Sequence, residues 1–283
     1  MQTWEDYITL HSSGEISGDV LPPAINHLGT DERASWWEDL DYRAALEKDV
    51  YPIPLTKDRE EYYGDNHFSY WASGLRDANL IVELASELGV DIRSYFDIGC
   101  ASGRVIRHFG VQYPEIKVYG CDINRLHAEW CNRHLPENCI VFQSHSVPSI
   151  PLPDSSLDFI SAFSVFTHIE AMETSWLMEI RRILRPGGLA WITVHTEDTL
   201  KEMDETWPLW RPTMSHPQKN ELLDEAREFA GNRLVMRWKG DASYSSNVFY
   251  RQSYIRQTWG RIMKIVDVRR RYHGYQDVVL FQK

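Results

Sequence analysis

Several features that mark other classes of protein are missing from this chain of 283 residues. No stretch approaches the roughly 18 consecutive apolar residues that suggest a membrane-spanning helix. The first residues, Met1 to Asp6, have neither the basic region nor the apolar run of a signal peptide. We therefore expect a cytoplasmic protein without a membrane partner.

The four cysteines lack the spacing of a metal site or of a disulfide framework. No Cys-x-x-Cys pair occurs, and structural zinc sites usually use closely spaced pairs of ligands. We expect no metal, and we expect four reduced thiols in or near the core: Cys100, Cys121, Cys131 and Cys139.

An excess of positive charge is also missing, because the formal net charge is −11. A general nucleic-acid binder needs a basic surface, since phosphate contacts supply most of its affinity. The densest basic run, Arg269 to Arg271, is short and is interpreted as a solvated turn between strands. We expect no nucleic-acid partner, and the sequence indicates no oligomeric state.

From about residue 73 onward, apolar strands alternate with amphipathic helices, which favours a parallel sheet. The expected strands cover 94–99, 117–122, 139–143, 157–163, 189–194, 264–270 and 276–283. Only a short turn containing Gly274 separates the last two strands, so they must pair antiparallel. The predicted fold class is α/β, with a Rossmann-like seven-stranded sheet that has one antiparallel strand and helices on both faces.

Two segments depart from this alternation. Residues 1–72 are rich in aromatic and acidic side chains and are predicted to form an N-terminal helical cap, with Asp31 capping a helix that runs from Trp36 to Leu46. The second domain, 73–283, contains an insertion after the fifth strand, at 196–246, with a helix near 221–230. This insertion is either a lid or substrate-binding segment, or a peripheral buttress without substrate contact.

The most informative segment is Tyr95–Arg104, an apolar strand that runs into a turn of small residues. Small residues let a ligand approach the backbone closely, and parallel sheets bind ligands at the carboxyl ends of their strands. Asp122 closes the next strand, 25 residues after Asp97, where its carboxylate can accept hydrogen bonds from ribose hydroxyls. The pattern predicts a nucleotide-type cofactor site; the alternative is a tight turn that binds nothing.

The spacing Asp97-x-Gly99-x-Ala101-x-Gly103 resembles the first motif of class I S-adenosylmethionine-dependent methyltransferases. In that family the glycines follow Gly-x-Gly-x-Gly, not the Gly-x-Gly-x-x-Gly of dehydrogenases; here Ala101 replaces the central glycine. Four other segments are typical of the family as well: Pro151–Asp158, Phe163–Ile169, Leu184–Gly188 and Gln276–Leu280. The resemblance, closest to bacterial enzymes of glycan and small-molecule pathways, implies S-adenosyl-L-methionine as the cofactor.

The resemblance also implies roles for individual residues, each in the cofactor site. The turn lines the methionine portion, Asp97 supports the turn or the amino group, and Asp122 holds the ribose. The full set of implied cofactor-binding residues is Asp97, Gly99, Cys100, Ala101, Gly103, Asp122, Ile123, Ser144, His145, Phe163 and Ser164. In this set Ile123 packs on the adenine face, and Ser144 and His145 contact the adenine edge. Phe163 and Ser164 close the site.

Two histidines follow predicted strand ends and are candidate general bases: His168 and His195. The alternative for each is a histidine that caps a helix or orders a loop. An Asn/Asp-Pro-Pro-Tyr sequence is missing after the fourth strand, which argues against methylation of a nucleobase amino group. The sequence therefore predicts methyl transfer to a small molecule or a glycan precursor at oxygen, with an NAD-dependent oxidoreductase and a catalytically inactive cofactor-binding protein as alternatives.

Overall fold

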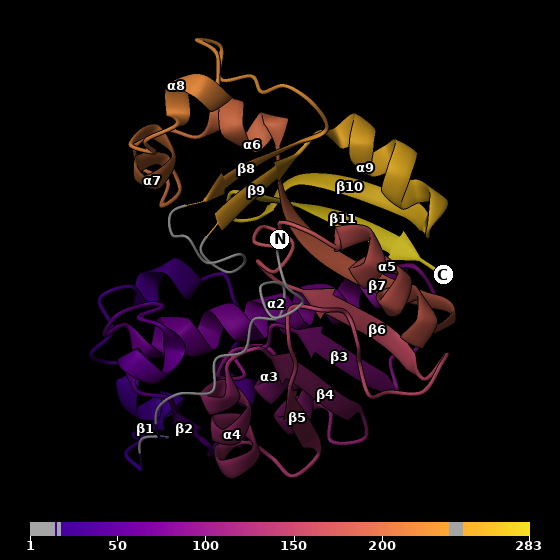
Figure 1. The fold of residues 1–283 in the computed structure, drawn as a ribbon. Coiled ribbons are helices and arrows are strands. Elements are labelled where there is room, and N and C mark those ends of the chain that lie inside the picture. The colour runs from indigo at the N-terminus through magenta and orange to yellow at the C-terminus, as the bar shows by residue number, and fades with distance from the viewer. Residues whose placement is uncertain (1–14, 16–17, 238–245) are drawn as a thin grey trace. The chain divides into compact units, whose positions relative to one another are not determined.

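The computed structural model describes residue 15, residues 18–237 and residues 246–283 (Figure 1). Within these ranges the chain divides into two compact units. The N-terminal unit holds the described residues up to His145 together with Leu157–Phe159. The C-terminal unit holds Ser146–Ser156 and the described residues from Ile160 to Lys283.

The N-terminal unit contains the first parallel strands, β3 (Ser94–Ile98), β4 (Lys117–Asp122) and β5 (Cys139–Gln143). They follow the order β6-β3-β4-β5, where β6 is Leu157–Ala162. Every residue of β3 is buried, as expected of a strand covered on both faces. The predicted bounds of these strands are confirmed to within one residue.

Three helices follow or precede these strands: α2 (His67–Glu87), α3 (Ile106–Gln112) and α4 (Arg125–His134). Asn124 caps α4, because its side chain accepts a hydrogen bond from the Leu126 amide at 3.0 Å. Gly74 of α2 lies so close to the chain after β3 that a Cβ would come within 1.9 Å of the Arg104 carbonyl oxygen. The long helix therefore packs directly against the segment that leaves the predicted cofactor turn.

The helix expected from Trp36 to Leu46, with Asp31 as its cap, is wrong. Only short elements lie in that region: η3 (Ala34–Trp37) and α1 (Arg43–Lys48). The Asp31 carboxylate accepts a local hydrogen bond from the Arg33 amide at 2.7 Å, and it also accepts hydrogen bonds from the amide and the hydroxyl of Ser69, at 2.7 and 3.1 Å. Ser69 lies in the first turn of α2, so this carboxylate satisfies the start of a helix that is 38 residues away in sequence.

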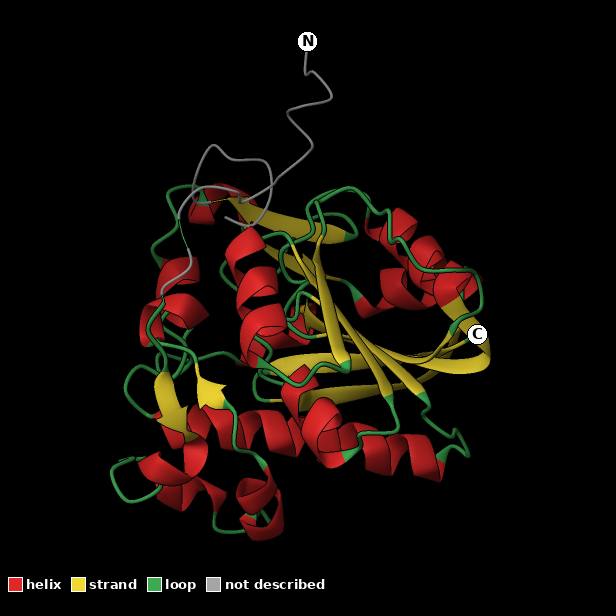
Figure 2. Cartoon of the chain, turned by 90° about the horizontal axis from the view of Figure 1, so that it is seen from below, coloured by secondary structure: helices red, strands yellow, loops and turns green. Residues whose placement is uncertain are grey.

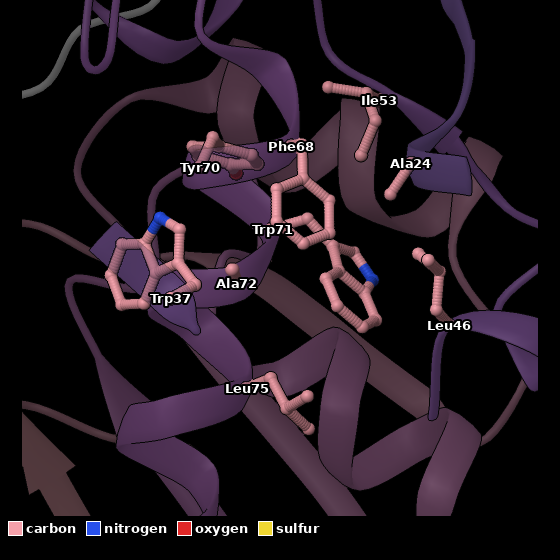
Figure 3. Packing of buried hydrophobic residues seen from close by; sticks show 9 residues of the cluster. All are labelled: Ala24, Trp37, Leu46, Ile53, Phe68, Tyr70, Trp71, Ala72 and Leu75. Carbon is pink, nitrogen blue, oxygen red and sulfur yellow. The ribbon is translucent and has the colours of Figure 1, made fainter. Parts of the chain in front are cut away.

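The segment before α2 has a core of its own within the N-terminal unit (Figure 3). It includes the antiparallel pair β1 (Leu21–Pro23) and β2 (Pro52–Ile53), together with η2 (Ala24–His27) and η4 (Thr56–Arg59). The core residues are Ala24, Trp37, Leu46, Ile53, Phe68, Tyr70, Trp71, Ala72 and Leu75. This cluster includes residues of α2, so the predicted boundary at residue 72 falls inside a helix; the division into a cap and a second domain stays a prediction.

A buried ion pair joins this segment to α3. The Arg107 guanidinium donates to both carboxylate oxygens of Asp49 at 2.9 Å, and both side chains are fully buried. Arg107 also donates to the carbonyl oxygens of Tyr51 and Pro52, each at 3.1 Å, and Trp71 donates to Asp49 at 2.7 Å. With so many partners, the desolvated charges are well compensated.

The C-terminal unit contains β7 (Leu184–Thr196), β10 (Lys264–His273) and β11 (Gln276–Gln282), in the order β10-β11-β7-β6. β11 pairs antiparallel with both neighbours; Val278 lies opposite Thr193 and Val279 opposite Val268. The C-terminal antiparallel hairpin is confirmed. The remaining helices of this unit are α5 (Glu173–Ile183), α6 (Glu197–Glu202), α7 (Trp210–Met214), α8 (Lys219–Leu222), α9 (Gln252–Thr258) and η5 (Trp259–Arg261).

The helix predicted near 221–230 is wrong, since α8 ends at Leu222. A turn follows in which the Asp224 carboxylate accepts a hydrogen bond from the Glu228 amide at 2.8 Å. Such a local bond offers the backbone an alternative to the helix. The segment packs through a buried cluster of Leu200, Met203, Leu209, Leu223, Phe229, Leu234, Met236 and Phe249.

Two further strands come from this part of the chain, β8 (Arg233–Arg237) and β9 (Ser246–Tyr250). β9 runs parallel to the end of β7, with His195 opposite Phe249, and β8 pairs antiparallel with β9. The fold class is confirmed as a mixed α/β fold with a mostly parallel sheet and helices around it (Figure 2). Its described strands number nine instead of the predicted seven, because of β8 and β9.

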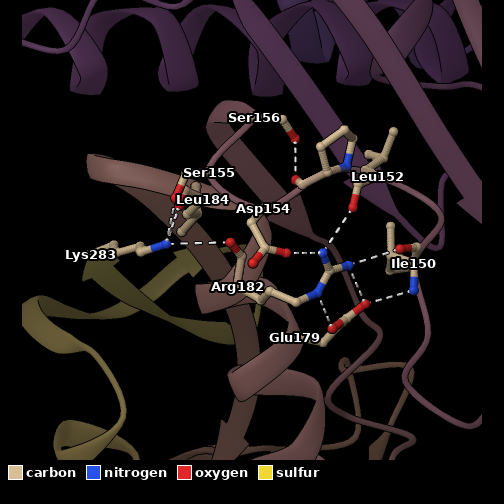
Figure 4. A network of polar contacts seen from close by, with 10 residues as sticks. Ile150, Leu152, Asp154, Ser155, Ser156, Glu179, Arg182, Leu184 and Lys283 are labelled. Carbon is tan, nitrogen blue, oxygen red and sulfur yellow. Dashed lines mark hydrogen bonds and ion pairs between the residues drawn. The ribbon is translucent and has the colours of Figure 1, made fainter.

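Arg182 of α5 forms hydrogen bonds with the loop before β6 (Figure 4). Arg182 donates to the carbonyl oxygens of Ile150 and Leu152 at 2.9 Å, and forms ion pairs with Asp154 and Glu179. The C-terminal Lys283 donates to the Leu184 carbonyl oxygen at 2.6 Å. The bonds from Arg182 satisfy backbone carbonyl groups of a loop that has few backbone–backbone hydrogen bonds of its own.

Candidate functional site

The turn after β3 holds three residues in the left-handed backbone region: Gly99 (φ 71°), Ala101 (φ 46°) and Gly103 (φ 80°). The Gly99 amide donates to the Cys121 carbonyl oxygen at 2.8 Å, and the Gly103 amide to that of Cys100 at 2.9 Å. Glycine adopts this region freely, whereas an alanine there costs on the order of 1–2 kcal/mol. The turn is therefore strained at the one position where the family pattern has glycine and this chain does not.

Part of the glycine pattern is explained by packing. A Cβ on Gly103 would lie 2.4 Å from Leu135 Cδ1 and 3.1 Å from Cys131 Sγ. A Cβ on Gly120, the neighbour of Asp97 in the β3–β4 register, would lie 2.8 Å from Cys100 Sγ. Small residues here allow the turn to sit against β4 and α4, in addition to leaving its backbone accessible to a ligand.

Asp122 lies at the end of β4 and is bonded to the turn. Its Oδ2 accepts a hydrogen bond from the Ala101 amide at 2.9 Å, and its Oδ1 accepts one from the Asn124 amide at 2.8 Å. Each carboxylate oxygen has two lone pairs, so both retain a second acceptor site for a hydroxyl group. This arrangement fits the predicted contact with a ribose.

His127 of α4 stands beside that carboxylate. Its Nδ1 lies 3.4 Å from Asp122 Oδ1 and its Nε2 lies 3.7 Å from Glu60 Oε1. Burial alone would lower the pKa of His127, but the carboxylates of Asp122 and Glu60 outweigh that effect and raise it. The positive charge of His127 is therefore favoured next to the predicted ribose-binding acid.

The ends of β4 and β5 bring the predicted adenine contacts together. The Ser144 amide donates to the Asp122 carbonyl oxygen at 2.8 Å, and Gln143 Nε2 donates to the Ile123 carbonyl oxygen at 3.0 Å. His145 Nδ1 is buried and has no hydrogen-bond partner among the described residues. A buried polar atom without a partner fits a place where a ligand supplies one.

The N-terminal unit thus gathers nine of the predicted residues at the carboxyl ends of β3, β4 and β5, namely Asp97, Gly99, Cys100, Ala101, Gly103, Asp122, Ile123, Ser144 and His145. Asp97 itself is buried, with 3% of its surface exposed. Their roles in binding stay predictions.

The other two predicted cofactor residues belong to the C-terminal unit, at the end of β6. Ser164 has a positive φ of 57°, and its amide donates to Thr193 Oγ1 at 2.6 Å. The centroid of the Phe163 ring lies 5.0 Å from the ring centroid of His273 and 6.1 Å from that of Trp191. Both side chains are held by neighbours in their own unit.

The two candidate bases also lie in the C-terminal unit. His168 Nδ1 is 2.6 Å from the Ser246 carbonyl oxygen, so in the neutral ring Nδ1 carries the proton and Nε2 is the basic nitrogen. His195 is 2% exposed, and its ring is flanked by those of Phe249 and Tyr275, with centroids 5.2 and 5.8 Å away. Neither nitrogen of His195 has a hydrogen-bond partner among the described residues.

The charge state of His195 follows from its surroundings. Burial, and then the nearby charge of His168, lower the pKa of His195 to about 3. The ring is therefore neutral at physiological pH. The structure places a neutral imidazole with two unpaired nitrogens in an aromatic environment, where it can accept a hydrogen bond.

Sequence reasoning missed the contacts that the segment before α2 makes with the turn. The Tyr70 hydroxyl donates to the Ser102 carbonyl oxygen at 3.2 Å, and the Ser102 hydroxyl donates to the Asp58 carbonyl oxygen. Arg59, the next residue, is buried although it lies in the charged run 57–61. A charged run of this kind is typical of a solvated surface, so the sequence contained no signal that Arg59 is buried.

The expected position of the four cysteines in the core is confirmed, because all of them are buried; none forms a disulfide in the described part of the chain. In the part of the chain that the structure describes, no group of His, Cys, Asp and Glu is arranged to hold a metal ion. None of the helices found there is long and apolar enough to cross a membrane.

Comparison with protein families identifies the central part of the chain. Residues 96–192, which contain the turn, Asp122 and the following strands, match the family model described as a methyltransferase domain. This segment is a methyltransferase domain. The match confirms the class I S-adenosylmethionine-dependent type expected from the sequence, and S-adenosyl-L-methionine as the cofactor of that type.

A curated relative agrees with this assignment. The chain resembles a malonyl-[acyl-carrier protein] O-methyltransferase from Hahella chejuensis, with 22% identity over 111 residues. The match covers 39% of this chain and 39% of the relative. The chain therefore aligns with well under half of the relative's length.

The chain is also similar to solved structures, the first of which supports the fold. An S-adenosylmethionine-dependent methyltransferase from Clostridium acetobutylicum has a TM-score of 0.50 and 12% identity, covering 76% of this chain and 91% of its own. A 1,6-didemethyltoxoflavin-N1-methyltransferase from Burkholderia thailandensis, with bound 1,6-didemethyltoxoflavin and S-adenosylhomocysteine, has a TM-score of 0.48 and 15% identity, covering 74% and 78%.

Proposed function

We propose that this protein transfers the methyl group of S-adenosyl-L-methionine to an oxygen atom of a small molecule or glycan precursor. The observation that carries the proposal is the strained turn after β3, whose Ala101 amide is bonded to Asp122, within a methyltransferase domain. The relative from Hahella chejuensis is an O-methyltransferase by name, which supports oxygen as the methylated atom.

The residues of the N-terminal unit account for binding. Asp122 retains lone pairs for the ribose hydroxyls, and His145 Nδ1 is available to the adenine edge. The small residues of the turn leave backbone exposed to the methionine portion. When bound, the cofactor supplies a methyl group already activated by its sulfonium sulfur, so the protein mainly has to align the acceptor with it.

His195 is the preferred candidate for the proton acceptor. A pKa of about 3 makes it a weak base toward a free alcohol. The oxygen of the acceptor becomes far more acidic once it gains the methyl group, because a protonated ether is a stronger acid than an imidazolium. His195 then takes the proton in a favourable step, and before that it orients the hydroxyl by accepting its hydrogen bond.

His168 is the alternative proton acceptor. Its Nδ1 is engaged by the Ser246 carbonyl oxygen, which fixes the ring and leaves Nε2 as the basic nitrogen. Substitution of each histidine in turn distinguishes the two candidates. Loss of the residue that accepts the proton lowers kcat, while the affinity for the cofactor stays unchanged.

Isothermal titration of the purified protein with S-adenosylhomocysteine and, separately, with NAD⁺ tests the cofactor. We expect micromolar binding of S-adenosylhomocysteine and no binding of NAD⁺. Binding of NAD⁺ alone would identify an oxidoreductase and reject the proposal. Incubation of methyl-labelled S-adenosylmethionine with pools of hydroxylated metabolites and sugar precursors then tests the acceptor; a protein that binds cofactor but labels nothing is the inactive alternative.

A further inference from the structure

Arg59 is a buried cation that forms no ion pair within the described part of the chain. Only 1% of it is exposed, and its guanidinium carbon lies 4.9 Å from the centre of the Tyr70 ring. Its Nη2 donates to His67 Nδ1 at 2.6 Å and to the Gly64 carbonyl oxygen. Its Nε and Nη1 are buried and have no hydrogen-bond partner in the described part of the chain.

The buried Arg107 and the partly buried Arg104 of this unit are both paired. Arg107 is bonded to Asp49, and Arg104 to Asp77 at 2.6 Å. Arg59 forms no ion pair with any described carboxylate; Asp65, Glu61 and Asp31 act on it only through space. Burial lowers its pKa for this reason, and the neighbouring His67 is kept neutral, since burial and the charge of Arg59 lower the His67 pKa as well.

An uncompensated buried charge costs several kcal/mol, so proteins pair buried charges or use them on a ligand. Three N–H groups of Arg59 lack acceptors: one on Nε and two on Nη1. A guanidinium with free N–H groups binds carboxylates and phosphates. An anionic group of a ligand would supply the partner that Arg59 lacks among the described residues.

The place of Arg59 indicates which ligand. Asp58, the residue before it, accepts the hydroxyl of Ser102 through its carbonyl oxygen, and Tyr70, the ring beside it, donates to the Ser102 carbonyl oxygen. Ser102 lies between Ala101 and Gly103 in the turn predicted to line the methionine portion. The residue before Arg59 and the ring beside its guanidinium are therefore both hydrogen-bonded to the turn that is predicted to bind the methionine portion.

The chain after Arg59 is strained. Glu60, Glu61, Tyr63 and Gly64 all have positive φ values, between 48° and 64°. Non-glycine residues in this region are uncommon, and such strain concentrates at functional segments. Because the guanidinium is enclosed, a ligand reaches it only when this strained segment shifts.

We propose that Arg59 binds the carboxylate of the methionine portion of the cofactor and that segment 60–64 shifts to admit it. The proposal rests on the proposed function, and it assigns a binding residue outside the matched methyltransferase domain. The carboxylate supplies the counter-ion that Arg59 lacks, and it accepts the free N–H groups.

Titration calorimetry with two ligands tests this assignment. The ligands are S-adenosylhomocysteine and its decarboxylated analogue, which differ only in the carboxylate. A hydrogen-bonded charge pair contributes about 1.5–3 kcal/mol, so we expect wild-type protein to prefer S-adenosylhomocysteine by about 10- to 150-fold. In Arg59→Gln this preference should fall to within about 3-fold, because the analogue binds as before and only the carboxylate contact is lost.

Arg43→Gln is the matched control, because Arg43 lies in the same N-terminal segment and is exposed; it should keep the full preference. Arg59→Lys, which retains the charge, should show an intermediate preference and serves if Arg59→Gln is unstable. Equal binding of the two ligands by wild type, or an undiminished preference in Arg59→Gln, would overturn the assignment while leaving the proposed function intact. Wild-type protein that binds neither ligand would reject the proposed function, and this assignment with it.

Discussion

At the scale of single residues, Ala101 is the position where local geometry and sequence disagree. Its φ of 46° lies where a side chain is unfavourable, yet its amide holds Asp122 in place. Replacement by glycine removes roughly 1–2 kcal/mol of strain and adds about 0.5–1 kcal/mol of unfolded-state entropy. We expect Ala101→Gly to unfold in urea with a free energy equal to that of wild type or up to about 1.5 kcal/mol higher.

Gly103→Ala is the contrasting variant. Its φ of 80° and the 2.4 Å approach of a Cβ to Leu135 make it both strained and overpacked. It should lose at least about 2 kcal/mol. A clear loss of stability in Ala101→Gly would mean that the turn needs the alanine methyl group.

In the proposed mechanism His195 lowers the stability of the fold and serves as the proton acceptor. Its two unpaired buried nitrogens cost about 1–3 kcal/mol. His195→Phe keeps the ring between Phe249 and Tyr275, so we expect higher stability at pH 7, unchanged binding of S-adenosylhomocysteine, and a kcat reduced about 10²- to 10⁴-fold. Unfolding curves, calorimetry and the methyl-transfer assay measure these three quantities; retained activity would reject His195 as base.

The pH dependence of that variant has a definite sign. In the folded protein the pKa of His195 is about 3, below the value of 6.5 in the unfolded chain. The unfolded state therefore binds the proton first, and wild-type stability falls as the pH drops from about 6.5 toward 3. The stability advantage of His195→Phe should grow over the same range.

His127 has the opposite linkage. Its pKa is raised in the folded protein by Asp122 and Glu60, in spite of burial. The folded state then binds the proton more tightly, so the stabilisation is fully present below the unfolded pKa and is lost as the pH rises through the folded pKa. The stability of wild type relative to His127→Gln should therefore be larger at pH 5.5 than at pH 9.

A matched comparison uses Asp122. In the Asp122→Asn background the same His127→Gln substitution should change stability by nearly the same amount at both pH values, because the principal carboxylate partner is gone. If the difference between pH values persists there, another group holds the proton.

At the scale of elements, the segment before α2 is joined to α3 by the Asp49–Arg107 pair, whose side chains are fully buried. Asp49→Ala leaves a buried guanidinium without its partner and should cost about 3–5 kcal/mol. Asp154→Ala is the control, because Asp154 is 78% exposed in its pair with Arg182 and its loss should cost at most about 1 kcal/mol. Urea unfolding of the two variants measures the difference; similar values would mean that the buried pair contributes no more than a surface pair.

The first parallel strands were predictable because each is a short, local run of mostly apolar residues. The bounds of β3, β4 and β5 agree with the sequence prediction to within one residue. The start of α2 was not predictable, since the carboxylate that satisfies it, Asp31, is remote in sequence. The helix expected near 221–230 failed for a local reason, the competing turn at Asp224.

At the scale of the whole molecule, the predicted cofactor-binding and catalytic residues are divided between the two units. Most of them gather in the N-terminal unit, and Phe163, Ser164, His168 and His195 belong to the C-terminal unit. β8 and β9 extend the C-terminal unit beyond the predicted sheet and place Phe249 against His195. Strand pairing of this kind depends on which segments meet, which no local pattern specifies.

The sequence by itself determined the class of domain and the position of the turn predicted to bind the cofactor, because the glycine spacing and the strand-end carboxylates are local patterns. Only the tertiary structure decided that His127 lies beside Asp122. It also decided that, among the described residues, Arg59 is buried without an ion pair and His195 has no hydrogen-bond partner. The physical reason is that burial and pairing depend on distant parts of the chain. A charged or titratable residue looks the same in the sequence whether water or a protein core surrounds it.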